Sequence, residues 1–264
     1  MPWFSLKLPI SEEARQWVNY GFSRLERMLG RKRLLEAKVV KPTAEDFPDP
    51  YDKTPEAAAL LFSRVCGYMN VDRSCITLEI FPDETEELKE LLPAWRSDGH
   101  RGAAGLYIHA HEKGRTSEEG SSGMVVAIRS SMLKDPTSLV ATMAHELGHV
   151  ILLGGNLLTH DSSDHEPLTD LLTVFLGLGI FTANSAARFQ QFQDDRRSGW
   201  SVRRLGYLPE PVFGYALAKF AMERTEHKPE WARHLSTNVH SDFKQSVRWL
   251  LKNPHYVPLA KPLG

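Results

Sequence analysis

Hydrophobic and polar positions follow a helical period over much of the chain. Residues 11–29 place large apolar side chains at helical spacing, beginning after Ser11, a residue type that favours helix N-caps, and ending near Gly30. Residues 56–69 are rich in alanine, leucine and phenylalanine, and residues 139–153 are almost entirely apolar. A helix that is apolar on all sides is an inner helix, so we predict that residues 139–153 are buried.

Strand patterns are short and lie in the middle of the chain. Residues 75–81 are rich in residues that favour strands. Residues 104–130 contain two such segments on either side of a polar loop, which predicts a β-hairpin directly before the apolar helix. We therefore expect an α+β fold in which a small mixed or antiparallel sheet packs on that helix.

The last third of the chain returns to helical patterns. Residues 184–197, the segment that starts at Leu208-Pro209-Glu210-Pro211, and residues 239–252 each predict a helix. Together they predict a helical C-terminal subdomain. The expected organisation is an N-terminal helix and linker over residues 1–55, a core over residues 56–181 and the helical subdomain over residues 182–264.

Composition and charge exclude several classes of partner. A net charge of −1 and a pI near 6.8 give no electrostatic signature for nucleic acid or for an anionic membrane. Only two cysteines are present, which is typical of a reducing compartment. The N-terminus lacks a signal-peptide pattern, and the apolar run 168–181 is too short to span a bilayer. We expect a cytoplasmic protein that binds neither nucleic acid nor membrane.

The apolar helix contains the motif His145-Glu146-Leu147-Gly148-His149. Residues four apart share one face of a helix, so both imidazoles can reach a single Zn²⁺. Glu146 then lies beside the metal and can take a proton from a metal-bound water. This spacing predicts a zinc hydrolase, with His145 and His149 as ligands and Glu146 as the catalytic base.

A second acidic segment follows His149 by seventeen positions. Glu166, Thr169, Asp170 and Thr173 are the polar residues of a segment that is otherwise apolar from residue 168 to 181, and their spacing places them on one helical face. Because unpaired buried carboxylates are costly, this face needs a polar partner. A zinc ion held by the two histidines would provide one, with Glu166 as the third ligand and Asp170 accepting a ring N–H from a ligand histidine.

The connection between the two segments leaves alternatives for the third ligand. Gly154 and Gly155 resemble a helix stop, and a short loop between helices makes them antiparallel neighbours. Glu166 could instead be favoured only by the helix N-terminus. In that case the site would be completed by Asp161, Asp164 or His165, of which His165 is the strongest competitor.

This pattern resembles the gluzincins, the thermolysin-like branch of the zincin metallopeptidases. The resemblance covers residues 124–181 and implies a zincin-like fold. It also implies that His145, His149 and Glu166 are zinc ligands and that Glu146 is the general base. Asp170 would then hold a ligand histidine in place by accepting its ring N–H. The short H-E-L-G-H helix is also similar to compact intracellular zincins that cleave phage-type repressors.

The predicted function is zinc-dependent hydrolysis of peptide bonds by a specific intracellular protease. Its partners would be a protein or peptide substrate and a regulatory protein. The alternative is a catalytically silent zinc-binding protein with an interaction or regulatory role; the intact Glu146 weighs against it. An oxyanion-stabilising group is also expected. The candidates are His160, His165, Arg204, Tyr207 and Tyr215.

Overall fold

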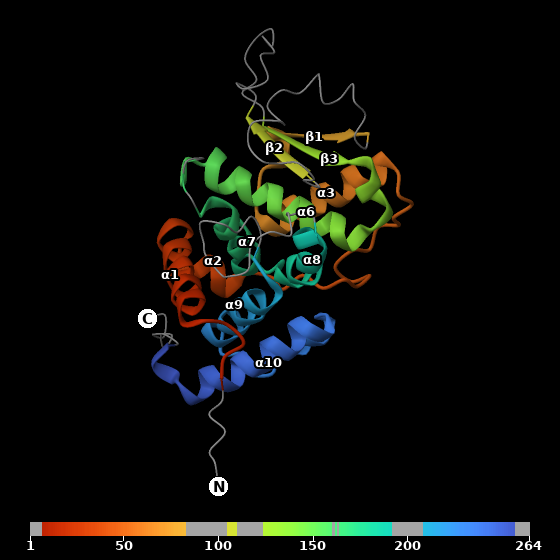
Figure 1. The fold of residues 1–264 in the computed structure, drawn as a ribbon. Helices are drawn as coiled ribbons and strands as arrows, with labels where there is room; N and C mark the ends of the chain where they lie inside the picture. The colour runs from red at the N-terminus through yellow and green to blue at the C-terminus, as the bar shows by residue number, and fades with distance from the viewer. Residues whose placement is uncertain are drawn as a thin grey trace. The chain divides into compact units, whose positions relative to one another are not determined.

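The computed structural model describes residues 7–82, 105–109, 124–159, 162, 164–191 and 208–256 (Figure 1). It is a mixed α+β structure in which helices predominate. Two compact units divide the chain. We call them the central unit, with residues 42–162 and 188–197, and the terminal unit, with residues 1–41, 163–187 and 198–264.

The central unit contains a three-stranded sheet with the order β1-β3-β2. Its strands are β1 (Ile76–Phe81), β2 (Gly105–His109) and β3 (Met124–Arg129). β2 pairs with β3 antiparallel, which confirms the predicted hairpin; its connecting loop lies outside the described residues. β1 adds to the other edge of β3 in parallel, so the sheet is mixed. Four successive residues of β3 are buried, as its central position requires.

Helix α6 (Pro136–His149) is the inner helix of the central unit and contacts β2, β3 and helix α3 (Pro55–Met69). The side chain of Asp135 accepts the backbone N–H groups of Thr137 and Ser138 at 3.1 and 3.2 Å, and Pro136 takes the first helical position. All residues from Ser138 to His149 are buried.

The terminal unit is helical and joins segments from both ends of the chain. It contains α1 (Glu12–Leu29), α2 (Arg31–Glu36), α7 (His165–Phe175), α9 (Glu210–Glu223), α10 (Thr237–Lys252) and, up to residue 187, α8 (Gly179–Gln191). Helix α1 packs on α7 and α9, and α9 packs closely on α10. The predicted N-terminal and C-terminal helices are therefore confirmed as elements.

The prediction of one continuous helix over residues 168–181 is wrong. Helix α7 ends at Phe175, and α8 starts at Gly179, ahead of the predicted start at residue 184. The break lies at Gly177, whose φ of +87° is strained for residues with a side chain. A Cβ atom at this position would also collide with the carbonyl oxygen of Lys38. The apolar pattern predicted burial correctly, but it could not reveal this backbone contact.

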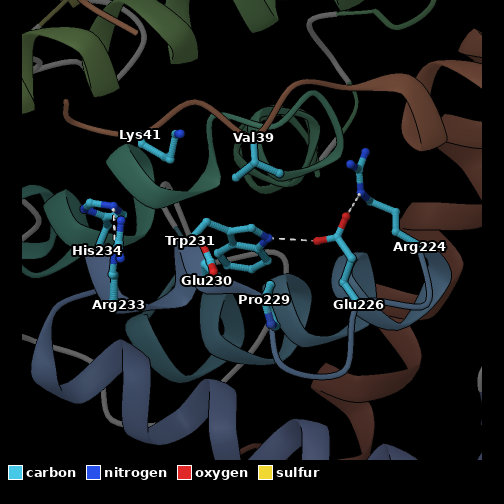
Figure 2. Close-up of a pocket in the computed structure, with 9 residues that line it drawn as sticks. All are labelled: Val39, Lys41, Arg224, Glu226, Pro229, Glu230, Trp231, Arg233 and His234. Carbon is cyan, nitrogen blue, oxygen red and sulfur yellow. Dashed lines mark hydrogen bonds and ion pairs between the residues drawn. The ribbon is translucent and has the colours of Figure 1, made fainter. Parts of the chain in front are cut away.

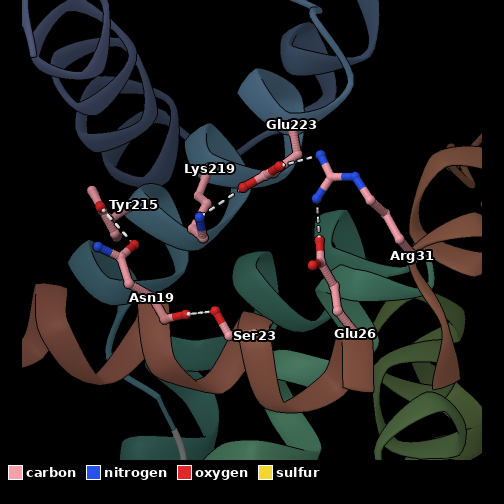
Figure 3. Close-up of polar contacts among 7 residues, drawn as sticks. All are labelled: Asn19, Ser23, Glu26, Arg31, Tyr215, Lys219 and Glu223. Carbon is pink, nitrogen blue, oxygen red and sulfur yellow. Dashed lines mark hydrogen bonds and ion pairs between the residues drawn. The ribbon is translucent and has the colours of Figure 1, made fainter. Parts of the chain in front are cut away.

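A network of charged side chains lies inside the terminal unit (Figure 3). Glu223 of α9 accepts from Lys219 Nζ at 2.8 Å and from Arg31 Nη2 at 2.7 Å. Arg31 also donates to Glu26 of α1 at 2.6 Å. The side chains of Lys219 and Glu223 are only 4% and 2% exposed. Because removal of a charge from water is costly, each of these two groups depends on the other for stability.

Burial raises the pKa of Glu26, and the nearby negative charge of Glu223 acts in the same direction, whereas Arg31 opposes both. Among the described residues, none of the helices is long and apolar enough to cross a membrane.

Candidate metal centre

His145 and His149 form a buried pair on one face of α6. Their side chains are oriented toward each other, with the two Nε2 atoms 3.1 Å apart and the ring planes inclined at 82°. The residues are 4% and 7% exposed. The predicted convergence of the two imidazoles is therefore present in the helix.

This separation suits a shared cation. Two nitrogen ligands at about 2.0–2.1 Å from a tetrahedral zinc ion lie about 3.3–3.4 Å apart, close to the observed spacing. A neutral pair could instead share one proton between the same atoms, because a neutral imidazole has one donor and one acceptor nitrogen. Glu146, between the two histidines in sequence, is 4% exposed. A buried carboxylate beside paired imidazoles is a combination that a cation would stabilise.

Glu166 lies in the first turn of α7 with its side chain 22% exposed. Glu166 belongs to the terminal unit and the two histidines belong to the central unit. The role of Glu166 as the third zinc ligand stays a prediction. Two imidazoles and a carboxylate form a donor set that zinc accepts, with a fourth position left for a water or a substrate.

The competing ligands have other contacts. Asp164 makes an ion pair with Arg24 of α1, with its two oxygens 3.0 and 3.3 Å from Nη1. The ring of His165 contacts the carboxylate of Glu166, with Nε2 at 3.2 Å from Oε1. Asp161 lies outside the described residues.

Asp170 is buried at 2% exposure, one helical turn after Glu166. Its Oδ2 accepts the backbone N–H of Leu208 at 2.7 Å, a contact between residues 38 positions apart. Asp170 therefore fixes the segment that leads into α9. A pattern of side chains along the chain cannot reveal a bond to a distant backbone group. The predicted bond from a ligand histidine to Asp170 stays a prediction.

The two threonines of the predicted polar face bond within the terminal unit. Thr169 Oγ1 donates to the carbonyl oxygen of His165 at 2.8 Å. Thr173 Oγ1 donates to the carbonyl oxygen of Asp170 at 2.7 Å and lies 2.8 Å from Thr182 Oγ1. Hydroxyl groups often bond to the backbone of their own helix in this way. These contacts show how both hydroxyls are accommodated in the interior.

One of the oxyanion candidates is placed away from solvent. Tyr215 of α9 is fully buried, and its hydroxyl donates to Asn19 Oδ1 at 3.0 Å (Figure 3). Burial raises the pKa of Tyr215 to about 12. His165 lies beside Glu166, whereas His160, Arg204 and Tyr207 lie outside the described residues.

A separate pocket of about 380 Å³ opens in the terminal unit beside Trp231 (Figure 2). Its charged lining is largely structural. Glu226 accepts from both Arg224 Nε and Trp231 Nε1 at 2.8 Å, and Arg224 also donates to the carbonyl groups at the end of α2. None of the predicted zinc ligands lines this pocket.

Comparisons with protein-family models, with curated proteins and with solved structures find no match for this chain.

Proposed function

We propose that this protein is a zinc-dependent peptidase that cleaves a restricted set of protein or peptide substrates. The observation that carries the proposal is the buried His145–His149 pair, with its Nε2 atoms 3.1 Å apart and the buried carboxylate of Glu146 between them in sequence. Two histidines alone could form a core hydrogen bond. A buried glutamate next to them in the sequence is the group that a zinc hydrolase needs as its general base.

In this proposal His145, His149 and Glu166 hold the zinc ion. When bound, zinc polarises the scissile carbonyl group and lowers the pKa of a water molecule to about 7. Glu146 accepts a proton from the attacking water and delivers it to the nitrogen of the leaving amine. The water oxygen forms the new bond to the carbonyl carbon as the carbon–nitrogen bond breaks.

The proposed setting is the cytoplasm, with a regulatory protein partner that controls the activity. The two cysteines support this setting, because Cys66 is buried, Cys75 is exposed and both are free. A broad mixture of peptides tests the reaction without assuming a sequence preference.

The zinc-loaded protein is incubated with a diverse peptide mixture, and new termini are identified by mass spectrometry. We expect a small set of cleavage sites that disappears after treatment with a zinc chelator and returns when Zn²⁺ is added back. The measurement is the rate at which each new terminus appears. A protein that carries zinc but produces no zinc-dependent cleavage, with peptides or with co-purified partner proteins, would instead support the catalytically silent alternative.

A further inference from the structure

The first turn of α7 holds two adjacent side chains in contact. Nε2 of His165 lies 3.2 Å from Oε1 of Glu166, and the two side chains are 25% and 22% exposed. An ionised carboxylate can only accept hydrogen bonds. A favourable contact at this distance therefore requires the imidazole to carry its proton on Nε2, which a neutral ring can do.

The backbone around this contact is held on both sides. The carbonyl oxygen of His165 accepts from Thr169 Oγ1 at 2.8 Å, one turn further along the helix. Asp164, directly before His165, is ion-paired with Arg24 of α1 at 3.0 Å. With the backbone fixed in this way, the main freedom left to Glu166 is rotation of its own side chain. A partner that restrains this rotation prepares the carboxylate for binding.

We propose that His165 is a positioning residue for the metal ligand Glu166. By donating Nε2–H to Oε1, the imidazole orients the carboxylate so that its second oxygen is the one presented to zinc. This inference rests on the proposed zinc site. His165 then supports the ligand Glu166 and is not itself the third ligand, because the Nε2 atom of His165 is directed to Glu166. Ligand-orienting partners of this kind typically change metal affinity by about 10–100-fold.

The test is the zinc affinity of four proteins, measured by competition with a chromophoric chelator. We expect His165→Ala to bind zinc about 10–100-fold more weakly than the wild type. In His165→Gln, the side-chain amide nitrogen can occupy the place of the imidazole Nε2 and donate to Glu166. His165→Gln should therefore recover most of the affinity. His165→Asn, whose shorter amide corresponds to the Nδ1 position, should stay close to the alanine variant.

Circular dichroism of all four proteins checks that they are folded, and the difference between the Gln and Asn variants separates positioning from general stability. Equal zinc affinity in the His165→Ala variant and the wild type would overturn the inference while leaving the zinc site intact. So would a His165→Gln variant as weak as His165→Ala. Full affinity in a fifth protein, Glu166→Ala, would make His165 the better ligand and would also overturn the inference. A wild type that binds no zinc would remove both proposals.

Discussion

Replacement of Glu146 by Gln is expected to leave zinc binding unchanged and to lower kcat/KM for peptide hydrolysis by about 10²–10⁴-fold. Gln has nearly the same shape as Glu but cannot accept the proton of the attacking water. Glu146 lies between two histidines in a buried stretch of α6, so a change of shape would disturb the ligands, whereas this change removes only the base. The measurement is the cleavage rate of a peptide identified with the wild type.

The matched control is Glu13→Gln, which makes the same chemical change at an exposed position of α1. It should retain the wild-type cleavage rate and zinc content. If Glu146→Gln cleaved the peptide as fast as this control, Glu146 could not be the base, and the proposed reaction would need another proton acceptor.

The largest expected effect on stability comes from Glu223. Glu223→Gln would leave the ammonium group of Lys219, whose side chain is 4% exposed, without its anion, and Arg31 would lose one of its two partners. Removal of one partner of a buried ion pair typically lowers the free energy of unfolding by about 3–5 kcal/mol. We expect the free energy of unfolding to fall by that amount, measured by urea denaturation. Adding Lys219→Met should recover much of the loss, because it removes the stranded charge.

The chain provides a matched control for this prediction. Glu36 and Lys32 are also four residues apart on a helix, but their side chains are 67% and 78% exposed and their charged atoms lie 3.7 Å apart. Exposed pairs contribute about 0–1 kcal/mol, so Glu36→Gln should change stability little. Equal effects of Glu36→Gln and Glu223→Gln would contradict the structural role assigned to the buried network.

Local rules predicted much of the helical structure. Ser11 accepts the N–H of Ala14 at 3.1 Å and begins α1 as expected, and Asp135 with Pro136 follows the same local rule at the start of α6. The hairpin formed by β2 and β3 also followed from alternating residues around a polar loop. In each case the residues that indicate the element belong to the element itself or stand directly next to it.

Contacts between distant segments could not be predicted in this way. The parallel addition of β1 to β3 depends on pairing across more than forty residues, and the break at Gly177 depends on the position of Lys38. Both are decided by tertiary packing, which local patterns do not encode. The bond from Leu208 N–H to Asp170 belongs to the same class.

In the candidate site, the i, i+4 spacing of the histidines placed the two imidazoles together. The acidic residue after the polar loop indicated a second helix, and Glu166 lies in its first turn. The sequence also singled out His165, but as a competing ligand. Its contact with the carboxylate of Glu166 depends on side-chain orientation within one helical turn, which spacing alone does not determine.

The most direct test of the proposed zinc site is the zinc content of the purified protein, measured by elemental mass spectrometry after exposure to Zn²⁺ and exhaustive dialysis. We predict about one zinc ion per chain in the wild type and in His227→Ala, which changes an exposed histidine, and loss of that zinc in His149→Ala. A zinc-free wild type, or a His149→Ala variant that keeps a full equivalent of zinc, would contradict it.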